Sequence, residues 1–152
     1  MSILFTLHLL AATLWVGGMF FAYMALRPVA ASLLEPPIRL ALWRAVFKKF
    51  FFWVWLAVVI LPASGYYLIF SVYHGMKYTP VPVHIMQLTG LIMIAIFIYL
   101  FFSPYKKLIL HLENNAIPDA AKQLNQIRQF IAINLTLGIV TIMIASTSHF
   151  FI

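Results

Sequence analysis

The chain contains near its start the run ILFTLHLLAATLWVGGMFFAYMAL, residues Ile3–Leu26, in which no residue carries a charge. A transmembrane helix needs about 20 apolar residues to cross about 30 Å of hydrocarbon. Three further runs without Lys, Arg, Asp or Glu follow, at residues 50–73, 83–103 and 130–152. A helix satisfies its own backbone hydrogen bonds, as the lipid interior requires. The sequence therefore predicts an all-α fold: a single polytopic membrane domain, residues 1–152, built as a four-transmembrane-helix bundle.

The composition agrees with a chain whose surface faces lipid. Hydrophobic residues make up 64% of the 152 residues and charged residues only 9%, whereas about a quarter of a soluble domain is charged. There is no cysteine, which excludes disulfides, thiolate metal sites and iron–sulfur clusters. The net charge is +7, but the basic residues flank apolar runs and form no stripe, so we expect a lipid bilayer and no nucleic acid as partner.

The basic residues predict the orientation of the chain. Nine of the ten Lys and Arg residues lie in the loops after the first and third runs, and only Lys77 lies in the middle loop. By the positive-inside rule both basic loops face the cytoplasm, and both termini are periplasmic. Each basic loop also has an amphipathic segment, opened by Pro36-Pro37 and by Pro118-Asp119 respectively. We expect these segments to form interfacial helices.

The two halves of the chain share a plan that points to an internal repeat. His8 precedes Pro28 by 20 residues, and His84 precedes Pro104 by the same 20 residues. The first and third spans run in the same direction, so the halves would be a parallel repeat about an axis along the membrane normal. At 1.5 Å per residue, each histidine lies about 30 Å from its proline, near the outer edge of the hydrocarbon.

Four of the five histidines are predicted to gather at the outer membrane face, and His111 alone lies in a cytoplasmic loop. His8 lies inside the first span, where a polar ring is costly and usually has a partner or a ligand. Trp15 follows seven residues later, on the same helical face. His74 and His149 lie at span ends, where the polar tip of a histidine can reach water.

The middle outer loop adds methionines to this set. It contains His74-Gly75-Met76 and His84-Ile85-Met86, two His-x-Met pairs. Imidazole and thioether ligands suit Cu(I), which is a soft ion. Gln87, close to His84, could orient that imidazole. The first hypothesis is therefore a periplasm-facing copper site built by His8 and His84, with further candidate ligands His149, His74, Met76 and Met86.

Haem b is the alternative cofactor. Two histidines from neighbouring helices of a bundle can ligate a b-type haem, and here they would be His8 and His84. The propionates would then face Lys77 and Tyr78. No histidine is available in the inner half of the spans, which argues against a two-haem cytochrome. A third hypothesis is a structural or assembly subunit of a membrane complex, without a cofactor.

Catalysis has little support in the sequence. We recognise no nucleophile–base pair, phosphate-binding loop or carboxylate pair, and no acid lies inside any span. This pattern argues against hydrolysis and against proton-coupled transport through carboxylates, so we do not expect an enzyme. Asn134 is a polar residue within the fourth span, where we expect a hydrogen bond between helices.

The stretch from His8 to Phe20, HLLAATLWVGGMF, resembles the first helix of the CopD copper-resistance family. Its short, stand-alone members are also matched by the remaining motifs: Arg27-Pro28, Glu35-Pro36-Pro37, Phe51-Phe52-Trp53, Val83-His84 and Phe102-Ser103-Pro104-Tyr105. The resemblance implies a bacterial inner-membrane protein of copper uptake or resistance. A periplasmic copper protein or a respiratory-complex subunit would be its partner.

A more distant resemblance is to the HemJ protoporphyrinogen oxidases, small four-helix proteins associated with haem b. It rests on a histidine seven residues before a tryptophan, as in His8 and Trp15, and on a His-x-Lys element that opens a later span. Here that element reads His84-Ile85-Met86. Met86 replaces the lysine of that element. The resemblance therefore implies haem ligation by His8 and His84, but not oxidase activity.

Overall fold

The computed structural model describes residues 2–147, and His149, one of the predicted ligands, lies outside them. Nearly all of the described residues are helical, and none of them forms a strand. The elements, in order, are α1 (Ser2–Phe20), the π-helix η1 (Phe21–Leu26), α2 (Arg27–Leu33), α3 (Pro36–Tyr73), the 3₁₀-helix η2 (Met76–Tyr78), α4 (Val81–Leu100), the π-helix η3 (Phe101–Tyr105), α5 (Lys106–Glu113) and α6 (Ile117–Thr147).

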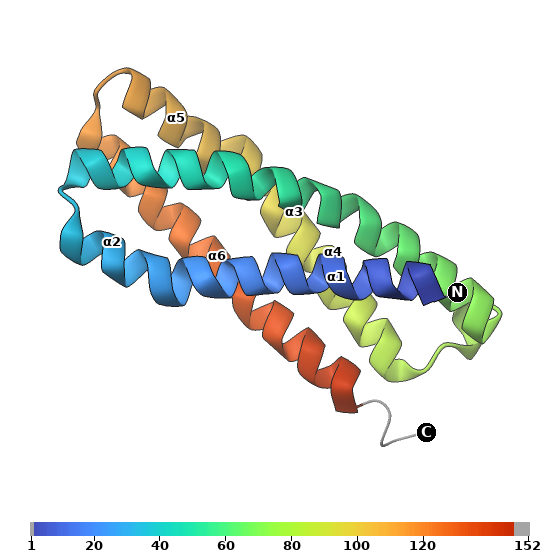
Figure 1. The fold of residues 1–152 in the computed structure, drawn as a ribbon. Helices are drawn as coiled ribbons and strands as arrows, with labels where there is room; N and C mark the ends of the chain where they lie inside the picture. The colour runs from blue at the N-terminus through green and yellow to red at the C-terminus, as the bar shows by residue number, and fades with distance from the viewer. Residues whose placement is uncertain (1, 148–152) are drawn as a thin grey trace.

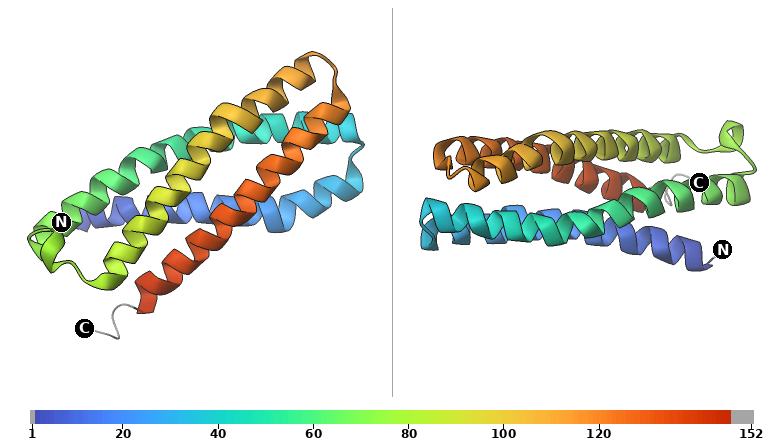
Figure 2. Two further views of the ribbon diagram at one scale, coloured as in Figure 1. Left: turned by 180° about the vertical axis from the view of Figure 1, so that it is seen from behind. Right: turned by 90° about the horizontal axis from the view of Figure 1, so that it is seen from above.

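These elements form four long apolar helices, which confirms the predicted bundle. By length and composition each could cross a membrane: Ile3–Leu33, Pro36–Tyr73, Val81–Glu113 and Ile117–Thr147. α1 packs chiefly on α3, and α4 packs chiefly on α6. Viewed from above, α1 to α3 make one layer and α4 to α6 the other (Figure 2).

The two ends of the bundle differ in the side chains that they carry, and we name each end after its characteristic residues. The start of α1, the end of α3, the start of α4 and the end of α6 lie at one end (Figure 1). We call it the histidine end, because it carries His8, His74 and His84. The opposite end holds the α2–α3 and α5–α6 turns and nine of the ten Lys and Arg residues, and we call it the basic end.

The helices extend further at the basic end than the apolar runs predicted. The segment after Pro36 does not lie apart as an interfacial helix: it is the first part of α3, which continues unbroken to Tyr73. The segment after Pro118 likewise continues within α6 as far as Thr147. No glycine or proline breaks the chain between Ile38 and Leu61, so nothing ends the helix at the membrane boundary. The amphipathic segments are therefore extensions of the spanning helices.

The order of elements repeats in the two halves. An α-helix, a π-helix and a short α-helix precede a long α-helix, first as α1, η1, α2 and α3, and again as α4, η3, α5 and α6. η1 ends just before Pro28, and η3 contains Pro104. A proline ring removes one amide donor and collides with the carbonyl four residues earlier, and the wider π-turn relieves that collision. Each of the two prolines of the sequence repeat thus lies within or just after a π-helix.

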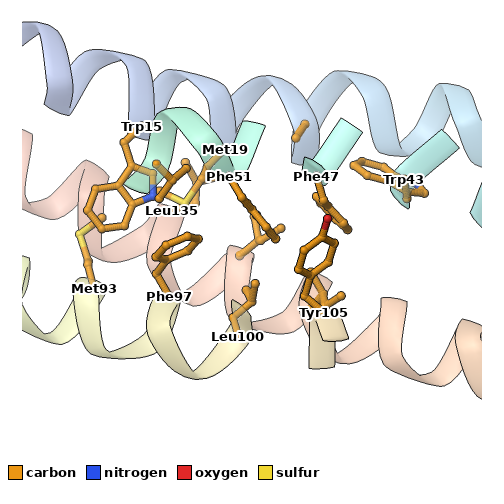
Figure 3. Close-up of a cluster of buried hydrophobic side chains, with 14 of the residues drawn as sticks. Trp15, Met19, Trp43, Phe47, Phe51, Met93, Phe97, Leu100, Tyr105 and Leu135 are labelled. Carbon is orange, nitrogen blue, oxygen red and sulfur yellow. The ribbon is translucent and has the colours of Figure 1, made fainter. Parts of the chain in front are cut away.

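The buried core is aromatic and lies mostly toward the basic end (Figure 3). The rings of Phe47 and Phe51 are stacked with centroids 5.0 Å apart. Phe51 also meets Tyr105 edge-on at 4.9 Å and Phe97 at 5.4 Å. These contacts join α3 to α4 and η3. Since lipid gives apolar helices no hydrophobic drive to associate, such packing contacts hold the bundle together.

Polar and small residues also contribute to the contacts between helices. Asn134 in α6 is buried and donates a hydrogen bond from Nδ2 to the Met93 carbonyl in α4 at 3.1 Å, which confirms the predicted bond between helices. A Cβ added to Gly138 would lie 2.7 Å from Cγ2 of Val16. Glycine at this position therefore lets α6 approach α1 closely.

Candidate functional site

His8 projects from α1 toward α3, and its partner there is Ser64. The His8 Nδ1 atom lies 2.8 Å from the Ser64 Oγ atom. The Ser64 side chain is buried, with 2% of its surface exposed, while His8 is half-buried. The prediction that a histidine at this depth has a partner is confirmed.

The surroundings of Ser64 decide which ring nitrogen of His8 carries the proton. Ser64 Oγ donates to the carbonyl of Ile60 at 2.6 Å and also lies 3.3 Å from the carbonyl of Leu61. A hydroxyl has one proton, so donation to the Ile60 carbonyl favours the arrangement in which Ser64 accepts from His8. Nδ1 of His8 then carries the proton, and Nε2 keeps a free lone pair. This is the tautomer in which a histidine binds a metal through Nε2.

Gly65, the next residue of α3, lies against the same ring. A Cβ added there would be 3.3 Å from Cε1 of His8. The imidazole is therefore held between a hydrogen bond to Ser64 and close packing on a residue without a side chain. Both contacts restrict its rotation.

Trp15, which lies on the same face of α1 as His8, packs in the core. It is 3% exposed, and its ring meets Phe97 of α4 edge-on with centroids 6.2 Å apart. Trp15 thus links the two layers, close to Phe97 and Met93 (Figure 3).

The contacts of Phe97 with Trp15 of α1 and with Phe51 and Trp55 of α3 show which side of α4 faces the α1–α3 layer. Successive residues of an α-helix are turned by about 100°, and α4 is regular over Val81–Leu100. Counting back from Phe97, Met86 and Gly90 lie within about 20° of its direction, whereas His84 lies about 140° away. The geometry therefore puts Met86 on the side of α4 that faces the α1–α3 layer. The meeting of His84 with His8 remains a prediction.

The other predicted residues lie at the surface of the histidine end. His74 is exposed at the C-terminal cap of α3, with a left-handed φ of 58°. Met76 is 38% exposed, and Lys77 and Tyr78 are exposed in the same η2 turn. His84, Met86 and Gln87 are half-buried in the first turns of α4. Within residues 2–147 the structure gives no hydrogen bond between the Gln87 and His84 side chains.

The described residues do not contain a cluster of His, Cys, Asp and Glu side chains that is ready to bind a metal ion. Among them, no group of three or more His, Cys, Asp or Glu side chains is placed to hold a metal ion. The three acids, Glu35, Glu113 and Asp119, all lie at the basic end. The donors present at the histidine end are imidazoles and thioethers.

Ser64 is a candidate site residue that the sequence did not identify as the partner of His8. Its signal was a serine next to glycine two residues after Pro62, inside an apolar run. Pairing it with His8 requires the packing of two helices whose residues are 56 positions apart.

Comparison with known proteins gives one match. The family described as CopD, copper resistance protein D, matches residues 44–148. Neither the curated proteins nor the solved structures gave a significant match.

Proposed function

This chain belongs to the CopD family, copper resistance protein D, and from that premise we propose that it is a copper-handling protein of the bacterial inner membrane with His8 as its central ligand. The family match supports a copper-resistance role, and the four long apolar helices support a multi-pass membrane protein. The nine-to-one division of basic residues supports an orientation in which the histidine end faces the periplasm.

The observation that carries the proposal is the hydrogen bond between His8 and Ser64. The serine holds the proton of the imidazole on Nδ1, which leaves Nε2 available to a metal ion. A histidine that binds a metal through one ring nitrogen commonly donates a hydrogen bond from the N–H group of the other. The acceptor of this bond sets the tautomer and the orientation of the ring.

The kind of donor at the histidine end fits Cu(I). Imidazole and thioether groups favour this soft ion, and carboxylates, which favour magnesium and calcium, lie at the other end of the bundle. Within the proposed site Met86 would join His8 as a ligand, because it lies on the side of α4 that faces the α1–α3 layer. His84 would be a further ligand, His149 stays a candidate from outside the described residues, and the exposed His74 and Met76 would deliver copper to the site.

This arrangement suits capture of copper from the periplasmic side, by exchange with a periplasmic copper protein or a respiratory-complex subunit. Ligand exchange is easiest where successive donors can replace one another without leaving the ion bare. The exposed His-x-Met pair at 74–76 would provide the first donors, and His8 the innermost one.

The test is a Cu(I) titration of the purified full chain in mild detergent, in competition with a chromogenic Cu(I) chelator. We expect the unmodified chain to withdraw Cu(I) from the chelator and His8→Ala to lose this ability. His111→Ala is the matched control, because His111 lies in the last turn of α5 at the basic end. Wild-type affinity in His8→Ala would reject the site.

An absorption spectrum of the same preparation tests the haem alternative. A b-type haem ligated by His8 and His84 would give a strong Soret band that either alanine substitution removes, whereas a Cu(I) site is colourless. A chain that binds neither copper nor haem would be a structural or assembly subunit.

A further inference from the structure

The basic end contains a cavity that the copper proposal does not use. It has a volume of about 300 Å³ and lies between the η1–α2 segment, the start of α3 and the middle of α6. Three arginines line it: Arg27, Arg39 and Arg128. They come from three separate helical segments, so the fold gathers positive charge that the sequence distributes over a hundred residues.

None of these arginines has an acidic partner within residues 2–147. The ion pair of the described residues joins Arg44 to Glu113 at 3.1 Å, outside the cavity. The Arg27 guanidinium lies over the Tyr23 ring, 4.3 Å from its centroid. The other two bond only to neutral oxygens: Arg39 to the Ala31 carbonyl at 3.5 Å and Arg128 to Asn125 Oδ1.

The floor of the cavity is apolar. Leu40, Trp43, Phe47 and Ile131 contribute to its lining and are all buried. Arg27 and Arg39 are half-buried above this floor, and Arg128 is exposed at the rim. A ligand that satisfies both surfaces must carry an anionic group and an apolar portion next to it.

The position of the cavity indicates where such a ligand would come from. Arg27 follows the first apolar run, and Arg39 lies near the start of α3, so both belong near the headgroup level of a bilayer. Guanidinium groups match the geometry of phosphate oxygens with paired hydrogen bonds. Basic pockets between transmembrane helices are also where anionic lipid headgroups bind.

We propose that this cavity binds the phosphate group of an anionic phospholipid, whose first acyl carbons cover the apolar floor. Arg27 and Arg39 hold the phosphate, and Arg128 closes the rim. The site is at the opposite end of the bundle from His8 (Figure 1), and it does not depend on the copper proposal.

Native mass spectrometry of the full chain, released from detergent with added lipid, tests this site. Phosphatidylglycerol or cardiolipin should remain bound in preference to phosphatidylcholine. Each arginine replaced should weaken retention about fivefold, since each basic side chain contributes about that factor to anionic lipid binding. Arg27→Gln with Arg39→Gln should therefore reduce it about 25-fold. Arg44→Gln is the matched control, because that arginine lies outside the cavity, and it should retain lipid like the unmodified chain.

Four outcomes would overturn the proposal: equal retention of phosphatidylcholine, unchanged retention in the double variant, an equal loss in Arg44→Gln, or displacement of the lipid by inorganic phosphate at comparable concentration. The last outcome would assign the arginines to a free anion instead of a lipid. If the double variant does not fold, Arg128→Gln, at the exposed rim, provides the decision. A fivefold loss supports the site and no loss rejects it.

Discussion

The Nδ1 atom of His8 and the Oγ atom of Ser64 lie 2.8 Å apart and join α1 to α3 at the histidine end. The same hydroxyl donates to the Ile60 carbonyl of its own helix, which favours its accepting from the histidine. One buried hydroxyl thus determines the tautomer of the residue on which the proposed site depends.

Ser64→Ala should weaken Cu(I) binding about 10- to 100-fold, the usual cost of removing a partner that orients a metal-binding histidine. The chelator competition measures it. Ser71→Ala is the control, because Ser71 is also in α3 and bonds only to the Leu68 carbonyl of its own helix. Equal affinities of the two variants would contradict the orienting role of Ser64.

Met86→Leu should weaken Cu(I) binding more than Met76→Leu does. Met86 lies on the side of α4 that faces the α1–α3 layer, while Met76 is exposed in η2. Leucine keeps the volume of methionine but removes the thioether, so binding of Cu(II) should change less than binding of Cu(I). If haem is bound instead, both variants should keep the spectrum of the unmodified chain, since the axial ligands are intact.

The orientation can be measured with fusions to alkaline phosphatase, which is active only in the periplasm. A fusion after Ile152 should be active, and one at Asn115, in the α5–α6 turn, should be inactive. The reverse pattern would move the histidine end to the cytoplasm and would remove the proposal of periplasmic copper capture.

Gly138→Leu should destabilise the bundle by about 1–3 kcal/mol, the usual cost of overpacking a tight contact. The new side chain would meet Val16, whose branched side chain has little freedom to move. Gly17→Leu should be nearly neutral, since no atom lies within 4 Å of a Cβ added there. The melting temperatures of the two variants in one detergent test the difference, and equal melting temperatures would contradict close α1–α6 packing.

The sequence predicted the bundle well, because each of the four uncharged runs must form a helix in lipid to satisfy its backbone hydrogen bonds. It also identified His8 by its depth, and a partner was expected and found. The extension of α3 back to Pro36 was missed, because charge marks where a span leaves the membrane and not where a helix ends. The direction of His84 around α4 and the approach of Ser64 to His8 depend on how separate helices are rotated against each other. Periodicity within one helix contains no information about that rotation.

The uneven burial of the bundle has a consequence for its motion. No residue of α4 before Met93 and no described residue of α6 after Gly138 is buried, while the aromatic core fills the part toward the basic end. Segments with few buried contacts open at low free energy, while well-packed segments stay closed. Residues 81–92 of α4 and 139–147 of α6 should therefore exchange their amide hydrogens sooner than the rest. At the histidine end, α4 and α6 would therefore separate from their neighbours at low free energy, while the core toward the basic end stays packed.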